Sequence, residues 1–221
     1  MEETSWWKVM FSGLIESIGA VASVKMDGSG LRLRIETKIS SELSLGDSIA
    51  VNGVCLTVAR YDDEGFEVDV SPETLRATSL NDKILRATVN LERPLQFDGR
   101  VGGHFVQGHV DAIGRVEEIH KQGEFWWLTI SYPPLIRKWL IPKGAIAVDG
   151  ISLTVATMDE DGFGVQIVPF TWANTRLHAI ENGTFVNLEC DMVGKYAVRA
   201  LEIRCDSESV KDRKLGEKNG S

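Results

Sequence analysis

The chain has 221 residues, of which 43% are hydrophobic, and it carries a formal net charge of −8 at pH 7. No stripe of Lys and Arg stands out against this acidic balance, so a nucleic-acid partner, whose phosphates require clustered cations, is disfavoured, and a small, neutral or weakly charged ligand is favoured. No apolar run reaches the roughly 18 residues of a membrane-spanning helix, so we expect no membrane partner and a soluble, intracellular protein.

Residues 1–9 form an N-terminal extension that precedes the repeated part of the chain. The extension is too acidic and too short for a signal peptide, so we expect a cytoplasmic protein, or one in an organelle stroma if the extension remains from a trimmed transit peptide. Cys55, Cys190 and Cys205 form an odd set without CxxC spacing. Such a set is typical of free thiols in a reducing compartment and predicts neither disulfides nor a metal site.

Two copies of one sequence pattern follow. Residues 49–59 read IAVNGVCLTVA, and residues 146–156 read IAVDGISLTVA, at an offset of 97 positions (146 − 49). A weaker copy lies upstream, where FSGLIESIGAV at 11–21 resembles VQGHVDAIGRV at 106–116. The register holds through further blocks, among them VNLE at 89–92 and 186–189. We therefore expect two tandem domains of one fold, which occupy residues 10–105 and 106–191.

Local patterns within each copy predict short strands. The alternation of apolar and polar residues in LRLRIE at 31–36 indicates a half-buried strand. Polar, Gly-containing stretches at 62–65 and 159–162 predict matching hairpin turns. Short helices are expected to open at Pro72 and Pro169, because Pro suits the first helical turn. Strands at intervals of about ten residues predict an all-β fold with one small antiparallel barrel in each half.

The chain continues beyond the second copy. Residues 192–205 carry apolar side chains at helical spacing and predict an amphipathic C-terminal α-helix. Its apolar stripe would pack either against the same helix in other subunits, as an oligomerisation helix, or against its own barrel. Residues 206–221 are polar and poor in apolar side chains, so we expect a disordered tail.

Four long motifs occur together in one order: MFSGLIE at 10–16, GDSIAVNGVCLTV at 46–58, GGHFVQGHVD at 102–111 and GAIAVDGISLTV at 144–155. This combination closely resembles the riboflavin synthase family. The resemblance implies two tandem six-stranded antiparallel barrels, a homotrimer in which the first barrel of one subunit faces the second barrel of a neighbour, and no cofactor or metal. It also implies the reaction, in which two molecules of 6,7-dimethyl-8-ribityllumazine dismutate to riboflavin and 5-amino-6-(D-ribitylamino)uracil.

The copies differ at matched positions suited to chemistry. Cys55 in the first copy corresponds to Ser152 in the second. A Cys in an apolar strand is ordinarily a core residue, but the resemblance implies that this one lies beside the ligand, where a thiolate could add to C7 of a lumazine; water or hydroxide is the alternative nucleophile. Ser152, Thr57 and Thr154 offer hydroxyls to the pteridine ring, although a strand Thr is ordinarily structural.

Two histidines lie near the start of the second copy. His109 corresponds to Leu14 in the first copy. An imidazole that titrates near pH 7 suits proton transfer to or from a lumazine methyl group, and although a lone His is more often structural, the resemblance implies a place at the substrate site. We expect His104 to have a structural role that joins the barrels.

Two charged residues complete the candidates. Asp191, where the first copy has Pro94, resembles an acidic family residue that could orient Ser152 or accept a proton; an exposed Asp at a strand end is the alternative. Lys143 resembles a ligand-contacting lysine that could stabilise negative charge on the pyrimidine ring; an ordinary solvated lysine is the alternative.

The resemblance implies catalytic roles for Cys55, His109, Ser152, Thr154 and Asp191. Phe170 departs from the family pattern, which commonly has a polar His or Glu there, so a polar contact in the second site is missing or replaced by packing. Gly13 to Ile15 are expected at the first strand. The full set implied to bind substrate is Gly13, Leu14, Ile15, Cys55, Leu56, Thr57, Asp69, Val70, Ser71, Pro72, Glu73, Thr74, Gly108, His109, Val110, Lys143, Ser152, Leu153, Thr154, Gln166, Ile167, Val168, Pro169, Phe170 and Thr171.

Two other classes of protein are compatible with the repeat. A non-catalytic antenna protein of the same fold binds one lumazine or flavin, but such relatives have lost parts of the catalytic pattern that is present here. A carrier or assembly module would explain the repeat but not the Cys/Ser and His/Leu differences between the copies. Association with the shell of lumazine synthase is left open by the sequence.

Overall fold

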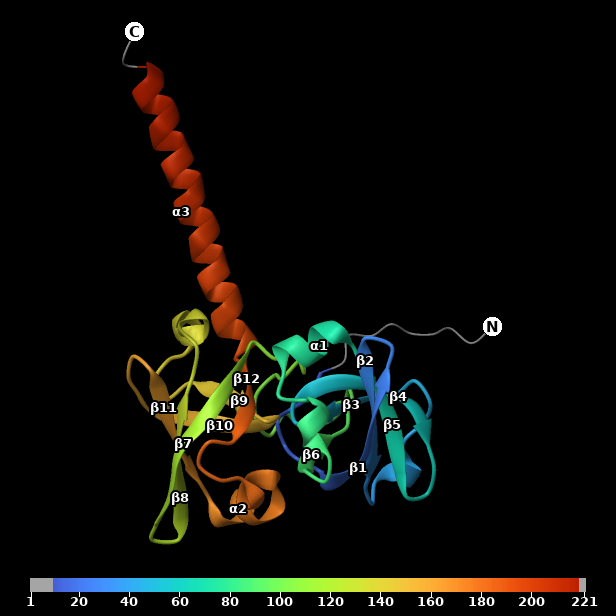
Figure 1. The fold of residues 1–221 in the computed structure, drawn as a ribbon. Coiled ribbons are helices and arrows are strands. Elements are labelled where there is room, and N and C mark those ends of the chain that lie inside the picture. The colour runs from blue at the N-terminus through green and yellow to red at the C-terminus, as the bar shows by residue number, and fades with distance from the viewer. Residues whose placement is uncertain (1–9, 219–221) are drawn as a thin grey trace.

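The computed structural model describes residues 10–218, with the backbone alone at residue 82 and at residues 206–218. Two closed antiparallel barrels of six strands each lie side by side, and a long helix leaves the second barrel (Figure 1). The predicted all-β fold with two homologous barrels is confirmed. Among the described residues, no helix combines the length and apolar character needed to cross a membrane.

The two barrels have the same circular strand order, β1-β2-β5-β4-β3-β6 in the first and β7-β8-β11-β10-β9-β12 in the second. The first barrel comprises β1 (Ser17–Asp27), β2 (Gly30–Glu36), β3 (Ser48–Val51), β4 (Val54–Tyr61), β5 (Gly65–Val70) and β6 (Thr88–Glu92). The second comprises β7 (Ala112–Gln122), β8 (Phe125–Ser131), β9 (Ala145–Val148), β10 (Ile151–Met158), β11 (Gly162–Ile167) and β12 (Phe185–Cys190).

The predicted turns and short helices are present in both barrels. The turns join β4 to β5 and β10 to β11, and in each the first Asp, Asp62 or Asp159, accepts two backbone N–H groups of its own turn through Oδ1. Each Asp therefore fixes the turn that the sequence predicts. The helices α1 (Pro72–Ala77) and α2 (Pro169–Asn174) both begin with Pro and follow β5 and β11.

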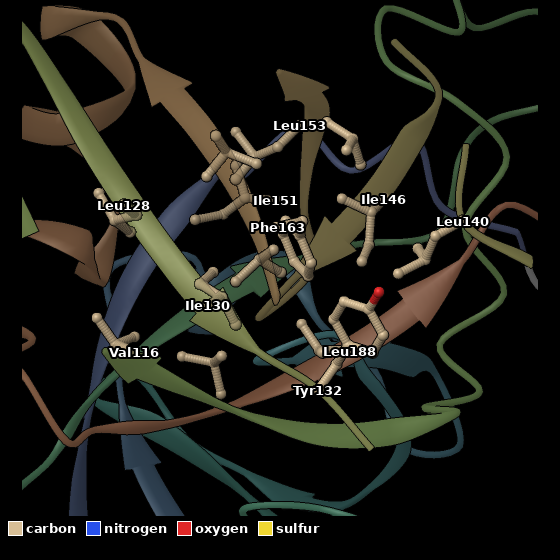
Figure 2. Packing of buried hydrophobic residues seen from close by; sticks show 14 of the residues in the cluster. Val116, Leu128, Ile130, Tyr132, Leu140, Ile146, Ile151, Leu153, Phe163 and Leu188 are labelled. Atoms are coloured by element: carbon tan, nitrogen blue, oxygen red, sulfur yellow. The ribbon is translucent and has the colours of Figure 1, made fainter. Parts of the chain in front are cut away.

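Alternation along the strands sorts side chains between barrel interior and outer wall. Leu153 of β10 is buried among the side chains that fill the second barrel, as Figure 2 shows. Its neighbours Ser152 and Thr154 face outward, and Cys55 and Thr57 of β4 are placed in the same way on the first barrel. These four polar residues thus lie on the outer walls.

Reciprocal contacts join the two barrels. Asn90 Nδ2 donates to the backbone O of Asp149 at 2.9 Å, and the matched Asn187 Nδ2 donates to the O of Asn52 at 2.9 Å. Because each contact has its counterpart with the copies exchanged, the barrels are related by an approximate two-fold axis. At the same interface the backbone N–H of Arg176 donates to Asn90 Oδ1 at 2.7 Å, and the Arg176 guanidinium forms an ion pair with Asp149 within the second barrel, with 2.6 Å between Nη1 and Oδ2.

The C-terminal helix is longer than expected. The helix α3 (Met192–Lys218) continues through residues 206–218, where a disordered tail was expected, so that expectation is wrong as far as Lys218. The segment 206–218 is rich in Glu, Lys and Arg and contains no Pro, and such residues favour a solvated helix even without an apolar face. Residues 1–9 and 219–221 lie outside the described residues.

The apolar stripe of α3 does not pack on its own barrel. The helix points away from both barrels (Figure 1), and Val193, Tyr196, Leu201 and Ile203 are between 54% and 64% exposed. Two arrangements were considered for this stripe, and the one in which it packs against its own barrel is therefore wrong. Near its start the helix is held by Lys195, whose Nζ lies 2.9 Å from Asp111 Oδ2.

Candidate functional site

The chain that precedes each barrel crosses to the other barrel. Residues 10–16, the first crossing segment, precede β1, which begins only at Ser17. Gly13 O accepts a hydrogen bond of 2.8 Å from Ser152 N on β10, and Ile15 packs against the core of the second barrel. The expectation that Gly13 to Ile15 lie at the first strand is therefore wrong, because they lie against the opposite barrel.

The second crossing segment, residues 106–111, makes the reciprocal contacts. Gly108 O accepts a hydrogen bond of 3.0 Å from Cys55 N on β4, and Val110 packs against the core of the first barrel. The two crossing segments also pair with each other at Phe11 and Val106, with N···O distances of 2.7 and 3.1 Å. Each candidate site therefore combines residues from both halves of the chain.

Glycine is needed where each crossing segment meets the opposite barrel. Gly13 has φ +76° and Gly108 has φ +77°, a left-handed conformation that other residues adopt at a cost. A Cβ atom at Gly13 would lie 2.6 Å from Cβ of Ser152, and one at Gly108 would lie 2.5 Å from Cβ of Cys55. The backbone of each segment thus lies directly against the residue at which the two copies differ.

The first candidate site lies on the outer wall of the first barrel. Cys55 and Thr57 face outward from β4, beside the second crossing segment with its exposed His109. Asp69, on the outer face of β5, is held in a bidentate ion pair by Arg32, with N···O distances of 2.7 and 2.9 Å. A ligand contact from the Asp69 carboxylate would compete with this ion pair.

The Cys55 thiol is not an activated thiolate in the free protein. The side chain is half-buried, and burial raises its pKa, with the nearby Glu189 carboxylate acting in the same direction. The hydroxyl of Ser48 hydrogen-bonds the thiol and opposes this effect without reversing it. The thiol is therefore protonated at neutral pH, so addition to a ligand would require that the bound state favour the thiolate.

The second candidate site is built around Ser152, and the structure brings to it a residue that the sequence interpretation treated as structural. His104 Nδ1 lies 2.7 Å from Ser152 Oγ. The backbone N–H of His104 donates to Ser12 O at 3.1 Å, which ties His104 to the first crossing segment, so its contact with Ser152 links that segment to the second barrel. Gly103 allows this approach, because a Cβ there would lie 2.7 Å from Cβ of Ser152. In the sequence, the two glycines before His104 are the feature that could have indicated this close approach to Ser152.

His104 is suited to accept the proton of Ser152. Burial lowers the pKa of His104, and the Asp191 carboxylate opposes this effect only in part, so the imidazole is neutral at pH 7. In the tautomer with the proton on Nε2, which we assign from the hydrogen bond, Nδ1 accepts from the Ser152 hydroxyl. Among the described residues, the buried Nε2 atom has no hydrogen-bond partner. Asp191 itself accepts from Val193 N at 3.0 Å, at the start of α3.

Lys143 is held in a strained conformation. Its φ is +65°, where the first copy has Gly46 with φ +85°. Its backbone N–H donates to Val155 O at 2.8 Å, which ties the strained residue to β10. A non-glycine residue in the left-handed region costs about 1–2 kcal/mol, and such strain is found preferentially at functional sites.

Replacement of Lys143 should separate stability from ligand binding. We expect Lys143→Gly to raise the free energy of unfolding by about 0.5 kcal/mol, because relief of strain exceeds the added chain entropy of Gly. The same change should weaken the binding of an anionic ring by removing the ammonium group. Arg86→Gly is the matched control, since exposed Arg86 also has φ +65°. Chemical denaturation and ligand titration measure both effects; unchanged binding in Lys143→Gly would assign Lys143 to the solvated surface.

The other predicted contacts surround the short helices. Residues 69–74 end β5 and open α1, and residues 166–171 end β11 and open α2. Phe170 is 76% exposed, so its ring does not replace the missing polar contact by packing within this chain. Four predicted contact residues are buried in the barrel interiors, so a ligand on the outer wall would reach only their backbone: Leu56, Val70, Leu153 and Ile167. Among the residues whose side chains the structure describes, no group of three His, Cys, Asp or Glu is arranged to hold a metal ion.

The fold and these sites define a class of protein with two homologous barrels, each bearing an outer-wall site completed by a segment of the other copy. The family description for the lumazine binding domain matches residues 12–94 and 107–191. The chain belongs to the lumazine-binding domain family.

Relatives and solved structures agree with this assignment. The chain is 44% identical to riboflavin synthase of Bacillus subtilis over 193 residues, covering 87% of this chain and 90% of the relative. It is 39% identical to riboflavin synthase of Schizosaccharomyces pombe over 196 residues, with coverages of 87% and 94%. The crystal structure of LumP complexed with riboflavin has the same fold, with a TM-score of 0.77 and 21% identity, over 81% of this chain and 98% of that one.

Proposed function

We propose that the protein catalyses the riboflavin synthase reaction, in which two molecules of 6,7-dimethyl-8-ribityllumazine are converted to riboflavin and 5-amino-6-(D-ribitylamino)uracil. The observation that carries the proposal is the pair of matched outer-wall sites, each completed by a crossing segment from the other copy. A reaction between two identical molecules needs two sites that hold the same molecule in related orientations. The similarity to riboflavin synthases supports the same reaction.

The two sites would accelerate the reaction mainly by orientation. Holding two reactants in place can recover about 7–11 kcal/mol of a bimolecular barrier. Sites on neighbouring subunits would supply such a pair if the first barrel of one subunit faced the second barrel of another. The sites nevertheless differ chemically, with Cys55 and His109 at one and Ser152 and His104 at the other. This difference gives donor and acceptor molecules separate environments.

The side chains of the second site suit proton transfer. A neutral His104 can take the proton of Ser152 or, through it, of a bound lumazine, and Thr154 and Lys143 can contact the ring from the same wall. His109, exposed on the second crossing segment, would serve the first site in the same way. The two products together contain all the atoms of two substrate molecules, so the balanced reaction calls for no external oxidant or reductant.

The assembly and location follow from the same proposal. The exposed apolar stripe of α3 suits packing against the same helix in two further copies, which would form the homotrimer expected for the family. We place the protein in the cytoplasm and propose association with a lumazine synthase shell as a further partnership. Size measurement by light scattering tests the trimer, and charged substitutions at Leu201 and Ile203 should reduce the mass to that of one chain.

The role of Cys55 can be tested by a conservative change. We expect Cys55→Ser to lower kcat about tenfold, which corresponds to about 1.4 kcal/mol, while the dissociation constant for lumazine changes by less than about twofold. The reason is that Ser keeps the shape of the site but is a weaker nucleophile than a thiolate. Cys205→Ser, at an exposed position on α3, is the control. An unchanged kcat in Cys55→Ser would assign the addition to water or hydroxide.

A conversion assay distinguishes an enzyme from an antenna. Purified protein is incubated with 6,7-dimethyl-8-ribityllumazine alone, in the presence of a metal chelator, and riboflavin is followed by its absorbance. The proposal predicts multiple turnovers. Lumazine that remains bound and unconverted would instead identify a non-catalytic binding protein.

A further inference from the structure

The repeated VNLE blocks end in two buried carboxylates. Glu92 is the last residue of β6 and Glu189 the last but one of β12, and each is 3% exposed. Burial raises the pKa of both side chains, to about 7 for Glu189, so the fold keeps each carboxylate against a desolvation cost. Because both copies bury a carboxylate at the matched position despite the cost of desolvation, we looked for the contacts that each carboxylate makes.

Each carboxylate accepts three hydrogen bonds from a crossing segment. Glu92 accepts from Ser12 N at 2.7 Å, from Ser12 Oγ at 2.8 Å and from Gly13 N at 3.1 Å. Glu189 accepts from three consecutive backbone N–H groups, those of Gln107 at 2.7 Å, Gly108 at 2.9 Å and His109 at 3.0 Å. The two carboxylates thus hold both crossing segments in matched ways.

The held residues are those that touch the opposite barrel. Gly13 contacts Ser152, and Gly108 contacts Cys55. We propose that Glu92 and Glu189 are positioning residues, each of which, fixed in one barrel, holds the crossing segment that completes the candidate site of the other barrel. Glu92 therefore sets the geometry at Ser152, and Glu189 sets the geometry at Cys55 and His109. Only the effect on turnover rests on the proposed function.

A carboxylate suits this role better than other side chains. It is an acceptor only, and its two oxygens can accept several N–H groups at once. Gln has nearly the same size but would turn an NH2 donor toward backbone N–H donors, and Asp is shorter by one methylene and reaches fewer of them. Glu92→Gln, Glu189→Gln and the corresponding Asp variants therefore disturb the crossing segments to different degrees.

Amide hydrogen exchange tests the proposal separately at each site. The N–H of Cys55 is bonded to Gly108 O, and the N–H of Ser152 is bonded to Gly13 O, so their exchange reports the second and first crossing segments. We expect Glu189→Gln to accelerate exchange at Cys55 by about tenfold or more without affecting Ser152, and Glu92→Gln to do the reverse, since bonds to charged groups are among the stronger ones. Asp149→Asn is the control for loss of a buried carboxylate outside the crossing segments.

The outcomes are decisive with or without activity. Equal acceleration at both amides in either variant, or at neither, would overturn the proposal by showing general loosening or no hold at all. If a Gln variant does not fold, the corresponding Asp variant should show the same site preference with a smaller acceleration. Turnover is a second readout: both Gln variants should lower kcat while the protein stays folded. If the wild-type protein makes no riboflavin but the Gln variants show the expected exchange pattern, the proposed function is refuted and the positioning role stands.

Discussion

Gly108→Ala is expected to lower kcat/KM by about 100-fold, the loss that follows when reacting groups are displaced by about 1 Å. A methyl group at this position would lie 2.5 Å from Cβ of Cys55, so the second crossing segment must move away from β4. His109 and Val110 would move with it. Steady-state kinetics with 6,7-dimethyl-8-ribityllumazine measures the effect, and Gly13→Ala should produce a similar loss through the contact with Ser152.

Gly123→Ala is the control for backbone strain. Gly123 has φ +63°, close to that of Gly108, but a Cβ there would meet no heavy atom within 4 Å. The substitution should cost about 1–2 kcal/mol of stability and leave kcat/KM unchanged. Full activity in Gly108→Ala would mean that the crossing segment does not set the geometry of the first site.

Removal of His104 is expected to produce a second large loss, about 100-fold or more in kcat, in the range of general acid–base catalysis. His104→Asn is the informative variant, because its side chain can still reach the position of Nδ1 and bond Ser152 but cannot accept a proton at neutral pH. His104→Ala removes both functions. If proton acceptance is the role, the two variants should be similarly slow, with dissociation constants for lumazine near the wild-type value.

The pH profile provides a direct check on His104. The pKa of His104 is lowered below its usual 6.5, and only the neutral imidazole can accept the proton. Turnover of the wild type should therefore fall as the pH decreases through a pKa below 6.5, and both variants should lose this acid limb. His178→Asn is the control, because His178 is exposed. A wild-type activity for His104→Asn would reduce His104 to the structural role first expected for it.

The fold could be predicted because its signals are local or repeated. Period-two alternation marks the strands, Asp62 and Asp159 mark the turns, and the matched blocks reveal two domains. The repeat matched Cys55 with Ser152, and the structure places them on the equivalent strands β4 and β10, where each faces the outer wall of its barrel. Comparison of the copies thus identified the centre of each candidate site.

The exchange of the crossing segments could not be predicted in this way. A repeat assigns Gly13 to the first domain by its order in the chain, whereas the contact with Ser152 depends on the path taken between barrels. For the same reason the contact of His104 with Ser152 was not expected, since it depends on the linker that precedes the second barrel. The length of α3 was underestimated because polarity was interpreted as disorder.

We propose that a single type of chain converts two identical lumazine molecules without any other reactant. The most direct measurement is the stoichiometry of a complete reaction, with substrate, riboflavin and the pyrimidine product each quantified by chromatography. The proposed reaction predicts one riboflavin and one 5-amino-6-(D-ribitylamino)uracil for every two lumazines consumed. Recovery of all the lumazine unchanged, bound to a folded protein, would contradict it.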